Sequence, residues 1–193
     1  MDKVSYFKKE ISYIKSEDVR SSLVTMINLL PDYFFEIPAS STLKYHPNYA
    51  LTESGLVKHT KVVVRIGIEL LDNAVTGGSF TAREKDLIIM ALVLHDGLKC
   101  GNPREKYTAF MHPMLMSEYI MRNKDALSIG IDDVRVVCNI IESHMGQWNV
   151  NPYKDNEVLP IPRNKLARFV HMCDYLASRK FIEVEFDGID IKY

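Results

Sequence analysis

Cysteine is scarce in this chain of 193 residues. The three cysteines, Cys100, Cys138 and Cys173, form an odd and scattered set without a C-x-x-C spacing. A disulfide framework needs paired cysteines at framework-like spacings, so the sequence argues against one. We expect reduced thiols and a cytoplasmic protein.

Long apolar runs and an excess of one charge are missing as well. No stretch of about 18 apolar residues lacks a charge, so no transmembrane helix is expected. The first ten residues have neither an apolar core nor a small-residue cleavage site, so a signal peptide is not expected. The chain has 24 basic and 25 acidic residues and a net charge of −1. Proteins that bind nucleic acid without sequence preference are normally basic, so nucleic acid is not favoured as a partner, although a local basic cleft stays open.

The remaining composition is that of a globular protein, with 47% hydrophobic and 25% charged residues, which argues against disorder. A chain of this length forms one domain with a sizeable core. Apolar residues recur at helical spacing through most of the chain, so the fold class is mainly α. We expect N-terminal helices in residues 1–33, a core in 34–180 and a β-like tail in 181–193.

The apolar spacing also places the elements. It predicts two helices in 4–30 and further helices over 55–71, 82–94, from 112 onward, over 132–144 and over 164–179. Thr81 and Glu84 match a capping box at the start of one of them. Residues 73–79 are expected to form a turn and 145–162 a long loop. Apolar and acidic residues alternate over 182–191, which predicts a strand or a short hairpin turning at Asp187-Gly188.

Histidines and aspartates are the candidate functional residues of this chain. His95-Asp96 ends an almost fully apolar helix, which places this pair at the floor of a cavity. Asp174 follows His171 by three residues on an apolar helix, so the two share a face. An acid that faces inward is costly unless it is paired or binds a metal, which makes Asp174 a candidate ligand. The alternative is that Asp174 faces water.

The order His59, His95-Asp96 and Asp174 resembles the HD-domain superfamily of metal-dependent phosphohydrolases. That family places a histidine on one helix, His-Asp at the end of a second helix and an aspartate on a later one. The segments 55–59, 92–96 and 174–178 are similar to the family's sequence around these residues. The resemblance covers about residues 34–180 and implies an HD-domain helical bundle with a short C-terminal strand or hairpin.

Two further segments refine the resemblance. Residues 34–40, followed by Gly55–His59, look like the HD domain of certain 3′-to-5′ exoribonucleases. Residues 143–148 look like small stand-alone HD proteins, including phage-encoded ones. The chain departs from the common His-Asp-Ile-Gly-Lys motif, because it reads His-Asp-Gly-Leu-Lys over 95–99. Lys99 keeps its distance from Asp96, so its phosphate-binding role carries over, but the shifted glycine changes the turn between them.

The resemblance implies a metal centre with one or two divalent transition-metal ions. Imidazole and carboxylate suit Fe, Mn, Zn, Co or Ni, and Mg stays open. We favour two ions, the first bound by His59, His95, Asp96 and Asp174, and the second by Asp96, His112 and His144. The alternative is one ion, with His112 and His144 binding the substrate's phosphate.

Residues around this centre are expected to serve catalysis and binding. Asp96 and Lys99 are the candidate catalytic residues, because a shared carboxylate and a nearby ammonium suit phosphoryl transfer. Candidate substrate-binding residues are Lys99, Arg104, Lys106 and Trp148. A solvated charged loop is the alternative for Arg104 and Lys106, and loop packing is favoured for Trp148 and Tyr107. We expect His171 to be a packed histidine that donates to a backbone carbonyl, the alternative being a ring that orients the Asp174 carboxylate. We expect His46 to be a surface histidine, the alternative being a contact with a phosphate.

The leading hypothesis is a metal-dependent phosphohydrolase. Its expected substrate is a nucleotide or a related small phosphate ester, and a mononucleotide is favoured over a polymer. A di-iron oxygenase of HD type is the second hypothesis, because a ligand set does not fix the reaction. The third is a non-catalytic nucleotide-binding HD protein. No membrane partner is expected, and a homodimer stays open.

Overall fold

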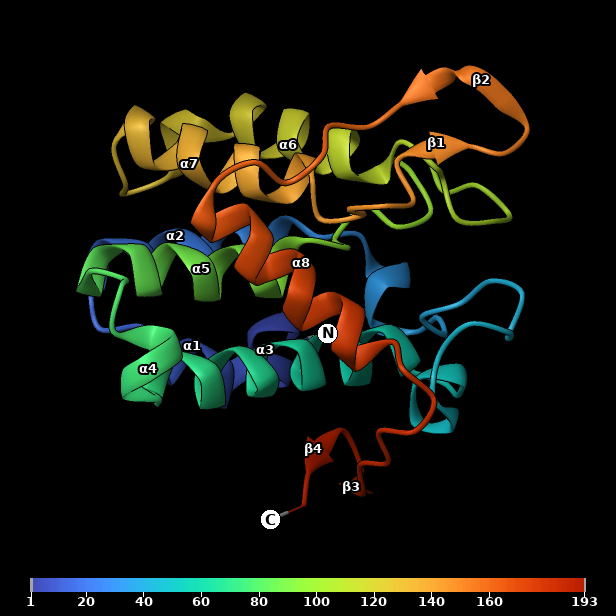
Figure 1. Cartoon of the computed structure of the whole chain (residues 1–193), viewed down its shortest axis with the longest axis horizontal. Helices are drawn as coiled ribbons and strands as arrows, with labels where there is room; N and C mark the ends of the chain where they lie inside the picture. Colours follow the sequence, from blue (N-terminus) through green and yellow to red (C-terminus); the bar gives the residue numbers. More distant parts are fainter. Residues whose placement is uncertain (1, 193) are drawn as a thin grey trace.

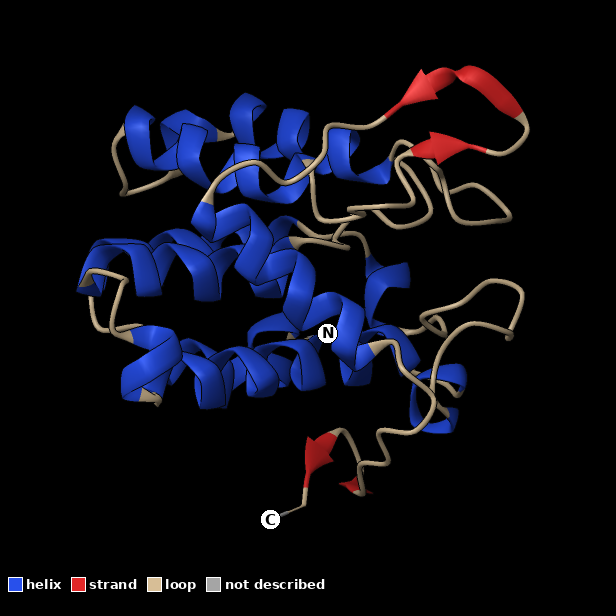
Figure 2. Ribbon diagram, in the orientation of Figure 1, coloured by secondary structure: helices blue, strands red, loops and turns tan. Residues whose placement is uncertain are grey.

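The computed structural model describes residues 2–192, the side chain of Asp155 excepted. Helices dominate, and two small hairpins lie at the periphery (Figures 1 and 2). The α-helices are α1 (Lys8–Ser12), α2 (Glu17–Leu29), α3 (Gly55–Asp72), α4 (Ala74–Gly77), α5 (Ala82–Leu94), α6 (His112–Arg122), α7 (Ile131–Glu142) and α8 (Lys165–Ala177). The strands are β1 (Val150–Asn151), β2 (Lys154–Val158), β3 (Phe186–Asp187) and β4 (Asp190–Ile191). Short 3-10 helices lie at Lys3–Phe7, Asp32–Phe35, Asn48–Leu51 and Lys124–Ala126.

The mainly α fold class is confirmed by this architecture. Among the helices of residues 2–192, none has the length and apolar character that crossing a membrane requires. One hydrophobic core runs from Phe7 to Ala177, so the N-terminal helices share it with the later ones. Val184, Phe186 and Ile191 of the tail pack against this core while staying partly exposed.

Helix α5 is the centre of the bundle. It packs against α2, α3, α7 and α8, and every residue from Asp86 to Leu94 is buried. A helix that is apolar all round has to be enclosed in this way. The predicted capping box is confirmed, because the Thr81 side chain accepts from the Glu84 N–H and the Glu84 side chain accepts from the Thr81 N–H. A fixed start and an enclosed body leave the residues after Leu94 little freedom.

Two segments differ from the sequence-based expectation. The expected turn over 73–79 contains the one-turn helix α4, which the Asn73 side chain caps by accepting from Val75 N and Thr76 N. The expected loop over 145–162 contains the hairpin of β1 and β2. Its longer strand is polar and shows no apolar alternation, so the period-2 signal is missing. The sequence did contain a turn signal in Asn151-Pro152. In the structure, the Asn151 side chain accepts a hydrogen bond from Tyr153 N.

The predicted C-terminal hairpin is confirmed. Strands β3 and β4 pair in antiparallel fashion, and Gly188 turns the chain with a φ of +60°. The Phe186 ring lies 5.3 Å from the Tyr49 ring, and Lys58 Nζ lies over its face at 5.8 Å. The Asp190 carboxylate accepts from Lys61 Nζ at 2.8 Å. These contacts fix the tail against α3 and the loop before it.

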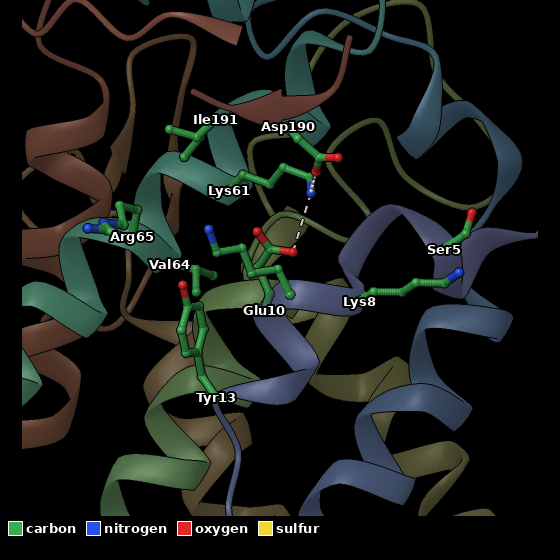
Figure 3. Close-up of a pocket in the computed structure, with 10 residues that line it drawn as sticks. Ser5, Lys8, Glu10, Tyr13, Lys61, Val64, Arg65, Asp190 and Ile191 are labelled. Carbon is green, nitrogen blue, oxygen red and sulfur yellow. Dashed lines mark hydrogen bonds and ion pairs between the residues drawn. The ribbon is translucent and has the colours of Figure 1, made fainter. Parts of the chain in front are cut away.

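Lys61 joins both ends of the chain to α3. Its side chain is 2% exposed, and its Nζ lies 3.3 Å from Oε2 of the buried Glu10 as well as 2.8 Å from Oδ1 of Asp190 (Figure 3). The three residues line a cavity of about 370 Å³ between α1, α3 and β4. Burial raises the pKa of Glu10, although the neighbouring Lys61 ammonium opposes this shift. Lys61 therefore pairs with a buried acid of the N-terminal helices and with an exposed acid of the tail.

Replacing Lys61 with Met should destabilise the protein, because the Glu10 carboxylate is then buried without its partner. We expect the free energy of unfolding in urea to fall by about 3–5 kcal/mol. Adding Glu10→Gln to Lys61→Met should recover part of this loss. The matched control is Lys8→Met in the exposed rim of the same cavity, with an expected change under about 0.5 kcal/mol. Equal effects of Lys61→Met and Lys8→Met would contradict the prediction.

Candidate metal centre

Five helices bring the six predicted ligands into one cluster. His59 lies in the second turn of α3, His95 and Asp96 directly follow α5, and Asp174 lies on α8. His112 begins α6, and His144 follows the end of α7. The four histidines and Asp96 are at most 1% exposed, whereas the Asp174 side chain is 19% exposed. In Figure 1 these helices converge from three levels of the bundle.

The Asp96 carboxylate lies between two groups of histidines. Its Oδ1 atom lies 2.9 Å from His112 Nε2 and 3.5 Å from His144 Nε2. Its Oδ2 atom lies 3.5 Å from His95 Nε2 and 4.0 Å from His59 Nε2. A carboxylate placed in this way can serve two ions, one through each oxygen.

Asp174 completes the group on the Oδ2 side. Its Oδ1 atom lies 3.0 Å from His59 Nε2 and 3.6 Å from His95 Nε2. The first donor set therefore consists of His59, His95, Asp174 and Asp96 Oδ2. The second consists of His112, His144 and Asp96 Oδ1. This division is the one that the two-ion hypothesis needs.

Backbone carbonyls fix the rings of three of the histidines. The Nδ1 atoms of His95, His112 and His144 each lie 2.8 Å from the carbonyl oxygen three residues earlier, at Leu92, Ala109 and Ile141. A carbonyl oxygen only accepts hydrogen bonds, so each Nδ1 carries the proton. In the neutral ring, each Nε2 then presents a lone pair to the centre. Fixing the tautomer in this way is how metal-binding histidines are usually oriented.

The centre fits a cation. The Nε2 atoms of His112 and His144 lie 3.2 Å apart, so their lone pairs face each other. Within residues 2–192, His95 Nε2 and Asp96 Oδ1 are buried without a hydrogen-bond partner. Acceptors that face acceptors are stabilised by a cation between them. Such imidazole and carboxylate donors suit Fe, Mn, Zn, Co or Ni.

The charges in the cluster favour the forms that bind metal. Burial alone would raise the pKa of Asp96, but the Lys99 ammonium and His95 hold it well below its ordinary value. The hydrogen bond from His59 and the nearby charge of His95 likewise outweigh burial and keep the pKa of Asp174 low. Burial lowers the pKa of His112 to about 4 and also lowers that of His59. The two carboxylates are therefore ionised, and these two imidazoles are neutral.

His95 behaves differently from the other histidines. Burial opposes its charged form, but the carboxylates of Asp96 and Asp174 outweigh burial and raise its pKa to about 10. Two anions thus lie beside this ring, and the Lys99 ammonium contacts only one of them, Asp96. A bound metal ion would take over the role of the positive charge on His95.

Lys99 lies beside the shared carboxylate. Its Nζ donates to Asp96 Oδ2 at 2.6 Å, and its side chain is 12% exposed. The shifted glycine of this motif is explained by packing, because a Cβ at Gly97 would lie 2.7 Å from Leu30 Cδ2 and from Met116 Sδ. The turn after α5 thus keeps a lysine within reach of the centre despite its altered sequence.

The other three predicted binding residues lie in loops, and each of them contacts an aromatic ring. The exposed Arg104 lies over the Tyr33 ring at 5.5 Å, and Lys106 lies over the Tyr107 ring at 5.3 Å. Trp148 stacks on Tyr175 with the ring centroids 5.7 Å apart, which agrees with loop packing. Arg179 lies over both of these rings. Substrate binding by Arg104, Lys106 and Trp148 stays a prediction.

His171 is confirmed as a packed histidine. Its Nδ1 lies 2.7 Å from the carbonyl oxygen of His144, which accepts the hydrogen bond. The ring fills the space beside Gly146, where a Cβ would lie only 2.1 Å from it. His171 therefore supports the backbone of a candidate ligand from α8, one turn before Asp174.

The expectation that His46 is a surface histidine is wrong. Its ring lies 4.8 Å from the His59 ring at an interplanar angle of 87°. Its Nδ1 is buried and has no hydrogen-bond partner among the described residues. Burial, with His59 next in importance, lowers its pKa to about 3. A histidine in a Pro- and Ser-rich loop carries no local signal of this burial, which results from tertiary packing.

The comparisons with known proteins agree with this geometry. A model of the HD domain family matches residues 51–179, which is more than half of the chain. No curated protein and no solved structure matches the chain.

Replacing Gly146 with Ala should disturb the second donor set through His171. The new Cβ would enter the space of the His171 ring, and the φ of +58° adds a cost of about 1 kcal/mol. We expect a metal titration to show about 10- to 100-fold weaker binding. Gly188→Ala is the matched control, because Gly188 has a φ of +60° but open space around it. Equal losses of stability and of metal affinity in both variants would refute the role of His171.

Proposed function

The chain belongs to the HD domain family, and we propose that it uses two divalent transition-metal ions to hydrolyse a phosphoester bond of a nucleotide or a related small phosphate ester. HD domains bind divalent metals and are typically metal-dependent hydrolases. One observation carries the proposal: the Asp96 carboxylate lies between two sets of histidines, with the Lys99 ammonium on it. This arrangement supports the binding of two cations at Asp96 and of one phosphate at Lys99 beside them.

The side chains of the centre divide the work between them. Bound ions supply the lowered pKa of a water molecule and the polarisation of phosphoryl oxygens. The first donor set would hold one ion and the second set the other, with Asp96 common to both. Lys99 binds the phosphoryl oxygens and offsets the negative charge that grows during transfer. Because the cluster is almost fully buried, these charges act with little screening by water.

Lys99 also favours hydrolysis over the two alternatives. An oxygenase with the same ligands has no need of an ammonium 2.6 Å from its shared carboxylate. A non-catalytic nucleotide-binding protein has no need of six potential ligands with their rings oriented. The three cysteines are free and buried, which supports the proposed cytoplasmic location.

The number of bound ions tests the proposal most directly. Protein purified without chelator should contain two transition-metal ions per chain, as measured by elemental analysis. His144→Ala should retain one ion, and Asp96→Ala should lose both. A single ion in the wild-type protein would instead assign His112 and His144 to phosphate binding. Absence of metal that persists after titration with Fe, Mn, Co, Ni, Zn and Mg would refute the centre.

Lys99 should affect turnover and not metal content. We expect Lys99→Met to lower kcat for a mononucleotide about 10²- to 10³-fold, because one charged donor to the phosphate is lost. Lys99→Arg should recover part of the activity, since the positive charge is kept. Elemental analysis should find the same metal content in all three proteins. Full activity of Lys99→Met would contradict the assigned role.

A further inference from the structure

Two charged groups of the candidate metal centre stay partly exposed. Of its charged groups, Asp174 and Lys99 keep 19% and 12% of their side-chain surface exposed, whereas Asp96 and the four histidines keep at most 1%. His46, which touches His59, is half-buried. These three partly exposed residues are the ones that a substrate of the centre can reach.

A cavity of about 790 Å³ lies beside His46. Its walls are the loop of residues 43–51, which includes His46, and the tail of residues 180–185. The chain that leaves α8 passes beside the short helix Asn48–Leu51 (Figure 1). The volume lies within the range of roughly 300–1,000 Å³ that small-molecule sites occupy. His46 is the side chain that both lines this cavity and contacts a candidate ligand of the centre.

We infer that this cavity binds the organic group of the phosphate ester, and that His46 contacts the substrate where the cavity meets the centre. The inference rests on the proposed phosphohydrolase function and adds the substrate class to it. The phosphate lies at Lys99, so the group attached to it extends past His46 between the two walls. The Nδ1 of His46 is buried and has no hydrogen-bond partner within residues 2–192, so a hydrogen bond with the substrate would satisfy it.

The lining indicates what this organic group is. Leu43, Tyr49 and Val184 offer apolar surface to a ring. Asn48, Glu183 and Glu185 offer acceptors for hydrogen bonds. Two carboxylates against the one ammonium of Lys180 repel additional phosphates. The cavity therefore suits a nucleoside monophosphate whose base carries an amino group, as adenine and cytosine do.

The position of both walls in the chain supports a role in specificity. Apart from Leu51, the lining residues fall outside the range 51–179 that matches the family. The ligand cluster, in contrast, falls entirely inside that range. This chain thus adds its own walls to a shared centre, which is how one catalytic site serves different substrates.

The tail is held firmly enough to form a wall. Phe186 of β3 packs on Tyr49. Asp190 of β4, the next strand, pairs with Lys61 of α3 (Figure 3). The cavity around Lys61 is not an alternative site for the organic group. Lys61 lies roughly 200° around α3 from His59, so that cavity faces away from the centre. It provides a control position on the same tail.

Nucleoside binding tests the inference without any turnover. Adenosine and cytidine should bind the metal-loaded protein more tightly than uridine in calorimetry. Val184→Trp fills the cavity and should weaken adenosine binding at least about tenfold. Ile191→Trp, on the same C-terminal tail but in the cavity around Lys61, should bind like the wild type. Equal affinities of these two variants would overturn the inference, whether or not the protein hydrolyses phosphoesters.

Conservative changes cover the case in which Val184→Trp does not fold. Glu183→Gln and Glu185→Gln together should abolish the preference for adenosine over uridine, because the acceptors of the amino group lose their charge. A preference that survives both changes would refute the assigned chemistry.

His46→Ala separates substrate contact from metal binding. We expect KM for adenosine monophosphate to rise at least about tenfold with a smaller change in kcat. The metal content should stay that of the wild type. Loss of metal would overturn the assignment of His46, since it would show that His46 holds His59 or the metal.

Discussion

The candidate centre depends on one buried carboxylate that two groups of histidines share. Asp96 follows α5, which other helices enclose, so its side chain has no room to turn toward water. Each of its oxygens faces the Nε2 atoms of two rings, and three of the four rings are fixed by carbonyls of their own helix or turn. Helix packing holds this carboxylate in place, the backbone carbonyls orient the rings toward it, and Lys99 donates to its Oδ2 atom.

Local patterns in the sequence predicted most of the framework. The helical period located α3, α5, α7 and α8 to within a few residues, and Thr81 with Glu84 predicted a cap that the structure contains. His95-Asp96 attracted attention because it ends an apolar helix. The roles of His112 and His144, however, came from the resemblance to HD domains, because neither lies in a pattern that shows burial.

The features that the sequence did not reveal depend on contacts between distant segments. His46 is half-buried because its ring packs against His59, and its loop lines one cavity together with the tail. The β1–β2 hairpin escaped detection because β2 is mostly polar and its sequence shows no apolar alternation. Helix α4 depends on one capping side chain at Asn73 and has no period long enough to recognise. Burial by tertiary packing leaves no mark on the local order of residues.

The molecule has one part that matches the family and two segments that lie outside the match. The ligand cluster lies within the segment that matches the family, whereas the loop before Ala50 and the tail after Arg179 lie outside it. Those two outer segments meet each other through Tyr49 and Phe186. A change in either one alters the surroundings of the centre and leaves its ligands in place.

Helix α8 has a consequence of its own. Asp174 belongs to the first donor set, and His171, one turn earlier, holds the His144 carbonyl in the second. The two sets are thus mechanically linked through a single rigid body. A slide of α8 along its axis would displace both sets together. Through this helix, neither donor set can therefore shift without the other.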